Sequence, residues 1–363
     1  MPKSMDRTRC GAVCALATLA LSAALTSAVA APTPPESPRI PFAERFHITG
    51  HGGIARAAGT SVTCRSAPHR AGPAGPPCAA SRRTDRTTVA RTAYLDADED
   101  RRTVGSSSAR LRLPAGSRVR YARLYWGGDL RPGGPRAART TGQVLLAGPR
   151  GRYEEVRADG PIGRRSTART DTYQASADVT ALVRRGGPGT YTVAREATGH
   201  RAARAGTRGG WVLVAAYENP REPLRRLTLW DGFEALGGKR RALAVELPGL
   251  RIPAHSRGRA GVVAYHGTPG THGKISARAG RITPVALRGA ADPANEGRQS
   301  MRPNSGRQAP DGATYHNALG FDSDVFDLTP ALRSGGDRLA FRFTTRKAGY
   351  LLGALFVQAD LRR

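Results

Sequence analysis

The stretch LRLPAGSR at residues 111–118 recurs as LRIPAHSR at residues 250–257, and each copy leads into an apolar run. Two further matches follow in the same order along the chain. They pair DVTAL at residues 178–182 with DLTPAL at residues 327–332, and GWVLV at residues 210–214 with GYLL at residues 349–352. Three ordered matches predict a duplicated unit of about 140 residues, which is within the usual size of a domain.

The pattern inside each unit is that of β-strands. Residues 109–113 alternate between apolar side chains and arginine, which indicates a half-buried strand. The continuous apolar runs at 211–217 and 351–357 are typical of strands in a sandwich core. One short helical turn per unit is framed by an aspartate and a glycine pair, at 178–187 and 327–336. We therefore predict an all-β fold of two tandem, duplicated antiparallel β-sandwich units resembling jelly rolls.

The apolar positions of these strands should form the cores of the two units, because a sandwich buries the inner face of each sheet. We expect the following side chains to be buried: Leu111, Leu113, Leu124, Trp126, Trp211, Leu213, Leu250, Ile252, Val263, Tyr265 and Leu351.

Residues 1–30 have the three parts of a secretory signal peptide. Arg7 and Arg9 form a basic start, an apolar run follows, and Ala28-Val29-Ala30 is a pattern that signal peptidases cut. A membrane-spanning helix is the alternative, but the run is short and ends at the cleavage pattern. We predict a secreted chain without a membrane span after cleavage. Its parts are a signal peptide at 1–30, a Pro-rich linker at 31–44, a first unit with a disulfide loop at 45–220, and a second unit at 221–363.

Four cysteines are present, and two of them lie in the predicted signal peptide. The remaining pair, Cys64 and Cys78, predicts a disulfide bond, because an even number of cysteines in an exported chain usually pairs. The alternative is a metal site, which would need more ligands than these two cysteines and His69 provide.

The formal net charge is +29, from 57 Lys and Arg against 28 Asp and Glu, and only four of the basic residues are lysine. One interpretation is a surface that binds an anionic cell-wall polymer or glycan. The other is a genome that favours arginine codons. The arginines are spread along the chain and are not clustered with aromatic residues, which favours the second interpretation and argues against a specific nucleic-acid partner. Non-specific binding of polyanions follows from the charge in either case.

Acidic residues are scarce, so their clusters are the candidate sites. Asp96, Asp98 and Asp100 alternate as at the start of a calcium loop, and we predict that they approach one another at a turn. Arginine occupies loop position six, where glycine is usual, and no glutamate stands at position twelve. The alternative is a set of solvated turn acids that pair with the arginines at 101, 102 and 110.

A second acidic set, Asp322, Asp324 and Asp327, matches a calcium loop less well. Asp322 and Asp324 would alternatively serve as paired carboxylates that act on a glycan. The sequence contains no Gly-x-Ser-x-Gly and no His-Glu-x-x-His motif, and residues 232–240 depart from the spacing of a phosphate-binding loop.

Several stretches together resemble a family of exported actinobacterial surface proteins of unknown function. These are 94–100, 103, 106–111, 122–128, 210–218, 229–233 and 319–327. The resemblance covers nearly the whole mature chain. In that family the module often stands ahead of surface-protein repeat domains, and this chain lacks such repeats. The resemblance implies a location and an architecture, and it implies no chemistry.

These observations lead to two hypotheses on function. The first is a secreted, non-enzymatic, surface-associated binding or structural module, stabilised by calcium at the acidic clusters and monomeric. It would be released, or held at the cell wall by non-covalent contacts. The competing hypothesis is a secreted glycan hydrolase whose paired carboxylates line a cleft between the units.

Overall fold

The computed structural model describes most of the chain that follows the predicted signal peptide. The described residues are 34–64, 92–98, 100–130, 141–168, 170–196, 208–265, 273–287, 321–346 and 349–361. Strands make up most of them, so the expectation of an all-β fold is confirmed. The predicted signal peptide and Cys78 lie outside the described residues, as does the side chain of Cys64.

The elements divide into two sets in chain order. The first set comprises β1 (Glu36–Ser37), β2 (Ile40–Thr60), β3 (Val62–Cys64), β4 (Thr92–Tyr94), β5 (Thr103–Leu111), β6 (Arg118–Leu130), β7 (Gln143–Ala147), β8 (Tyr153–Arg157), β9 (Ile162–Ser166), β10 (Asp171–Asp178), α3 (Thr180–Gly186), β11 (Gly189–Glu196) and β12 (Arg208–Glu218). The second set comprises β13 (Leu224–Leu236), β14 (Ala242–Leu247), β15 (Gly258–Tyr265), β16 (Gly273–Ala279), β17 (Val285–Ala286), β18 (Phe321–Asp327), the 3₁₀ turn η1 (Thr329–Leu332), β19 (Leu339–Thr345) and β20 (Tyr350–Asp360). We refer to these sets as the first half and the second half.

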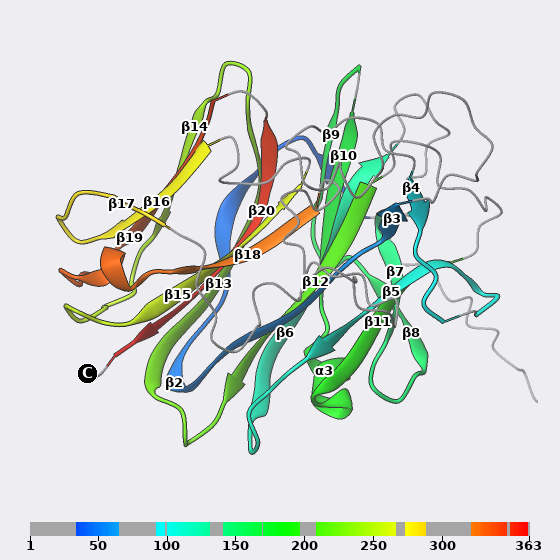
Figure 1. Ribbon diagram of the computed structural model, residues 1–363, viewed down its shortest axis with the longest axis horizontal. Coiled ribbons are helices and arrows are strands. Elements are labelled where there is room, and N and C mark those ends of the chain that lie inside the picture. Colours follow the sequence, from blue (N-terminus) through cyan, green and yellow to red (C-terminus); the bar gives the residue numbers. More distant parts are fainter. Residues whose placement is uncertain are drawn as a thin grey trace, which may run out of the picture. The chain divides into compact units, whose positions relative to one another are not determined.

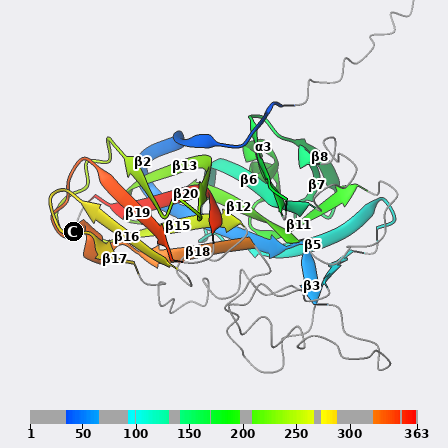
Figure 2. The same cartoon turned by 90° about the horizontal axis from the view of Figure 1, so that it is seen from above.

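The described strands form one large sheet, two smaller sheets and a short hairpin (Figure 1). The large sheet has ten strands in the order β1-β9-β10-β6-β12-β2-β13-β20-β15-β18. The sheet β5-β11-β7-β8 covers its first-half strands, and the sheet β14-β19-β16-β17 covers its second-half strands. In both views these smaller sheets lie at opposite ends of the described unit (Figure 2).

The same order of elements occurs in both halves. The order β10-β6-β12-β2 of the first half corresponds to β18-β15-β20-β13 of the second, and β5-β11-β7-β8 corresponds to β14-β19-β16-β17. The helix α3 follows β10 as η1 follows β18. Before each of these turns an aspartate accepts a backbone hydrogen bond, from Thr180 N–H to Asp178 (2.8 Å) and from Thr329 N–H to Asp327 (2.9 Å).

Strand β2 joins the two halves because it changes partner along its 21 residues. Residues 40–51 pair with β13, and residues 52–60 pair with β12. At the change-over, Gly52 lies so close to β12 that a Cβ atom there would be 1.9 Å from the Tyr217 carbonyl oxygen. Only glycine fits at this crossing.

The structure differs from the predicted organisation at the boundary between the linker and the first unit. Strand β2 begins at Ile40, inside the stretch 31–44 that we expected to be a linker. Its first part also pairs with the second half and not with the unit predicted at 45–220. The reason is that Ile40, Phe42 and Phe46 carry apolar side chains that pack against the second half and the contact between the halves.

Three clusters of buried apolar side chains result from this arrangement. One fills the first half around Trp126 and Trp211, and one fills the second half around Phe341 and Phe343. The third combines side chains of both halves, and we call this contact between β6, β10 and β12 on one side and β13, β15, β18 and β20 on the other the central interface.

The predicted core positions are buried except for one. Leu113 is only half-buried, because it lies beyond the end of β5 and lines a shallow surface depression. Val263, Tyr265 and Leu351 are buried in the central interface and not in a sandwich core.

Glycines let aromatic rings lie flat against the strands of the central interface. A Cβ atom at Gly127 would be 2.4 Å from the Tyr173 carbonyl oxygen and 2.7 Å from the Tyr265 ring. A Cβ atom at Gly210 would be 2.4 Å from the ring of Phe321. Real side chains do not approach this closely, so a larger residue at either position would push the two halves apart.

Replacing Gly127 by alanine should destabilise the fold by about 1–3 kcal/mol, because the added methyl group overpacks the central interface. Thermal unfolding measures the effect as a melting temperature lowered by about 2–4 °C per kcal/mol. Gly160→Ala is the matched control, since no heavy atom lies within 4 Å of a Cβ atom there. Equal effects of the two substitutions would contradict the close packing.

Candidate functional site

A group of heavily buried charged side chains lies in the central interface. On β6, Ala122, Leu124 and Trp126 face the first-half core, so the alternation of the strand turns Arg123 and Tyr125 toward the second half. The side chain of Arg123 is only 5% exposed. A charge buried this far from water needs partners close by, because its desolvation is costly.

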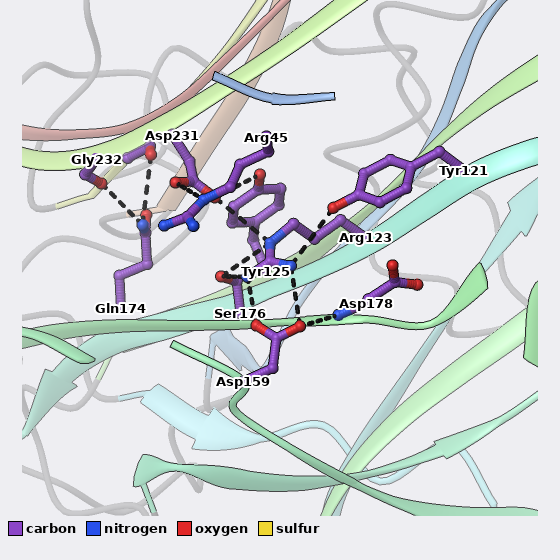
Figure 3. A network of polar contacts seen from close by, with 11 residues as sticks. Arg45, Tyr121, Arg123, Tyr125, Asp159, Gln174, Ser176, Asp178, Asp231 and Gly232 are labelled. Carbon is purple, nitrogen blue, oxygen red and sulfur yellow. Dashed lines mark hydrogen bonds and ion pairs between the residues drawn. The ribbon is translucent and has the colours of Figure 1, made fainter. Parts of the chain in front are cut away.

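Arg123 has partners from both halves (Figure 3). Its Nη atoms donate to both carboxylate oxygens of Asp159, at 2.5 and 3.1 Å, and to the Ser176 hydroxyl at 2.9 Å. Its Nε lies 3.4 Å from a carboxylate oxygen of Asp231, which belongs to β13 of the second half. The guanidinium therefore connects strand β6 to strand β13 in the facing part of the same sheet.

Asp231 is the acceptor at the centre of the network. Its carboxylate, 4% exposed, accepts hydrogen bonds from Arg45 Nε at 2.6 Å and from the Tyr125 hydroxyl at 3.0 Å. Burial, together with the Asp231 carboxylate, raises the pKa of Tyr125 well above its usual value. Tyr125 therefore keeps its proton and remains a donor to Asp231 at every physiological pH.

Gln174 of β10 forms a second polar contact across the central interface. Its amide nitrogen donates to the carbonyl oxygens of Gly232 (2.9 Å) and Gly353 (3.3 Å) in the second half. The ladder between β13 and β20 is irregular between residues 231 and 234, and such a bulge leaves backbone groups without a ladder partner. Gln174 supplies a hydrogen-bond donor to two carbonyl groups at this bulge from the facing strand β10.

The sequence analysis missed this network. Arg123 stands inside the apolar run that follows the first copy of the repeat, at residues 119–126. The alternation Tyr121-Arg123-Tyr125 was the available signal, because it places three polar side chains on one face of a strand whose other face is apolar. Asp231 and Gln174 carry no comparable signal, since their partners are distant in sequence.

The structure brings two members of the first acidic set together and turns the third away. Asp96 and Asp98 both accept from the Ser106 hydroxyl, at 3.2 and 3.0 Å. Asp100 instead pairs with Arg102, at 2.7 Å. The hydrogen bonds from Arg102 lower the pKa of Asp100 to about 2. One of the neighbouring arginines named in the alternative interpretation thus neutralises Asp100.

In the second acidic set, Asp322 and Asp324 lie together and Asp327 lies apart at the turn η1. Asp322 pairs with Ala264 and Asp324 pairs with Val262, and both of these neighbours belong to the second-half core. The two carboxyl groups therefore face the inside of the second half, and Asp322 is 2% exposed.

Both acids have raised pKa values. Burial raises the pKa of Asp322 well above its usual value, and the Asp324 carboxylate raises it further. Burial also raises the pKa of Asp324, although Arg56 opposes this change. The raised pKa favours the protonated form of Asp322, whose two carboxyl oxygens are buried without a hydrogen-bond partner among the described residues.

Neither acidic set forms a site with three metal ligands in the part of the chain that the structure describes. No group of three or more His, Cys, Asp or Glu side chains there is arranged to hold an ion. Glu99, a neighbour of the first set, lies outside the described residues. Calcium binding stays a prediction, and so does the bond between Cys64 and Cys78. No helix among the described residues has the length and apolar character needed to cross a bilayer.

No protein-family model and no curated protein matches the chain. Two solved viral structures show a distant similarity. The major capsid protein P2 of bacteriophage PM2 matches 74% of this chain and 96% of its own, at 12% identity and a TM-score of 0.22. A chain of Sulfolobus Turreted Icosahedral Virus matches 74% of this chain and 91% of its own, at 10% identity and a TM-score of 0.24. At TM-scores this low, neither similarity shows a shared fold or a shared function.

Removing the central acceptor should destabilise the protein strongly. Asp231→Ala leaves Arg123 and Tyr125 buried without that acceptor, and we expect a loss of about 3–5 kcal/mol in the free energy of unfolding. Glu154→Ala is the control: its partner Arg185 is exposed, so this loss should stay below about 1 kcal/mol. A loss below about 1 kcal/mol for Asp231→Ala in urea unfolding would show that the network does not hold the halves together.

Asp322→Asn should stabilise the protein, and the gain should grow with pH. A folded pKa raised above the unfolded value of about 3.9 means that the native state binds the proton more tightly. The resulting stability is complete below about pH 4 and is lost as the pH rises toward the folded pKa. Asparagine cannot ionise, so the melting temperature of the variant should exceed that of the wild type at pH 8 by more than at pH 4. The exposed Asp337→Asn should show no such trend, and a pH-independent effect of Asp322→Asn would show that folding does not raise the pKa of Asp322.

Proposed function

We propose that this chain is a secreted, non-enzymatic, surface-associated module that consists of two duplicated β-sandwich units held as one rigid body. The duplication is supported by the matching strand orders of the two halves and by the three ordered sequence matches. The sequence matches coincide with corresponding elements: residues 178–182 lead into α3 and residues 327–332 into η1, and the third match lies in β12 and at the start of β20.

The observation that carries the proposal is the direction in which the buried charges point. Arg123, Asp231 and Tyr125 bind one another across the central interface, with Asp159 completing the pairing of Arg123. A catalytic group must contact a substrate, whereas each of these side chains is already bound within the fold. Their arrangement fits a role in fixing the two halves, which is what a structural or binding module requires.

The competing hypothesis of a glycan hydrolase rests on Asp322 and Asp324. Glycosidases hold their two carboxyl groups about 5–5.5 Å apart for retention, or about 6.5–9.5 Å apart for inversion. Asp322 is only 2% exposed, so its carboxyl group offers no surface against which a sugar could lie. Both groups also face the second-half core.

A reducing-end assay on a panel of wall polysaccharides and glycans separates the two hypotheses. We expect the wild type to release no more product than Asp322→Asn/Asp324→Asn, while both retain any polymer that they bind in a pull-down. Turnover by the wild type that the double variant loses would establish the hydrolase. Failure of both proteins to bind any wall polymer would remove the binding part of the proposal.

A further inference from the structure

The outer face of the sheet β14-β19-β16-β17 presents a line of basic side chains. The strand alternation turns Leu243, Val245, Ile275, Ala277, Phe341 and Phe343 inward to the second-half core. The alternate positions therefore point outward, and Lys274, Arg278 and Arg342 among them are exposed.

The register of the sheet places these three cations in a regular zigzag. Lys274 stands opposite Thr344, Arg342 opposite Ser276, and Arg278 opposite Ala340. Arg342 is therefore offset by two residues from each of the other two cations. With a rise of about 3.3 Å per residue and about 4.8 Å between strands, neighbouring cations are about 8 Å apart and the line is about 13 Å long.

Acidic neighbours do not neutralise this line within the described residues. Glu246 is the acid on the outward face of β14, and it lies 3.8 Å from Arg338. The opposite outer sheet differs: there Glu155 pairs with Arg157, and the Tyr153 hydroxyl binds Asp98.

The other outward side chains of this face are small. They are Ala242, Ala244, Ser276, Ala286, Ala340 and Thr344. The outward positions of these strands hold no aromatic ring on which a nucleobase could stack, and stacking of bases on aromatic side chains is the usual basis for binding single-stranded nucleic acid. A flat face with evenly spaced cations suits a partner that is recognised by its charges alone.

We propose that this face binds an extended, acyclic phosphodiester polymer whose successive phosphates are contacted by Lys274, Arg342 and Arg278. The guanidinium groups of the two arginines can each bind a phosphate through two parallel hydrogen bonds, and Lys274 adds a point charge. The small side chains allow the polymer backbone to lie close to the sheet. This inference deepens the proposed binding function by naming the partner class and the surface.

The test compares two triple variants with the same change in charge. Lys274→Gln/Arg278→Gln/Arg342→Gln removes the proposed line, and Arg110→Gln/Arg112→Gln/Arg150→Gln removes three exposed arginines near the opposite sheet. Binding of synthetic poly(glycerol phosphate) is measured by calorimetry between 50 and 200 mM salt. Contacts to three phosphates should contribute about −2 to the slope of log K against log salt. Between 50 and 200 mM salt this contribution weakens binding by the wild type about twentyfold, and it should be absent in the first variant.

The proposal predicts that the control variant retains the wild-type slope and affinity within about twofold. Equal losses in the two variants would show that net charge alone governs binding. Equally tight, face-dependent binding of a polyuronate or of a single-stranded oligonucleotide would refute the choice of partner. Either result leaves the rigid-module proposal standing, because that proposal is tested by unfolding and by the reducing-end assay.

Discussion

The structure depends on the burial of Arg123 against Asp231 between the two facing parts of the ten-stranded sheet. Face-to-face packing of sheets normally uses apolar side chains, because any polar group placed there loses its water. Here a guanidinium, two carboxylates and a tyrosine hydroxyl satisfy one another across the contact, with partners on β2, β6 and β13. Such a network tolerates little displacement, because moving one half against the other would leave a buried charge without its partner. It therefore fixes the position of one half against the other.

The packing around this network follows from the same constraint. Glycines on β6 and β12 let the rings of Tyr265 and Phe321 approach the backbone. The two halves therefore lie close enough for Arg123 to reach Asp231. Strand β2 adds a covalent connection, because one continuous strand pairs with β13 and then with β12. Backbone pairing, ring packing and ion pairing thus all act on the same contact between the halves.

The sequence predicted the local features of the fold well. The alternation around Leu111 and the apolar run at Trp211 indicated strands, and both side chains are buried, because the face that a strand buries is written into its own residues. The path of β2 could not be predicted, since the same residues 40–60 satisfy the pattern of one long strand whichever neighbours they pair with.

The candidate site was predicted only in part. Asp322 and Asp324 were singled out as a pair, and they do lie together, because residues two apart on a strand share a face. Their burial inside the second half was not predicted, since it depends on the sheet that covers β18. Arg123 was overlooked although it alternates with Tyr121 and Tyr125 on one face of its strand, because the alternation does not show what that face contacts.

The two halves should unfold as one body, and the tryptophans allow a direct measurement. Trp126 and Trp211 lie in the first-half core, and Trp230 lies in the second-half core. Urea unfolding would be followed by fluorescence in Trp230→Phe, which reports on the first half, and in Trp126→Phe/Trp211→Phe, which reports on the second. We expect that, in each variant, the fluorescence transition of the half that keeps its tryptophan coincides with the loss of total β-structure measured by circular dichroism. If circular dichroism showed two separate steps, and the fluorescence of each half followed only one of them, the halves would unfold independently.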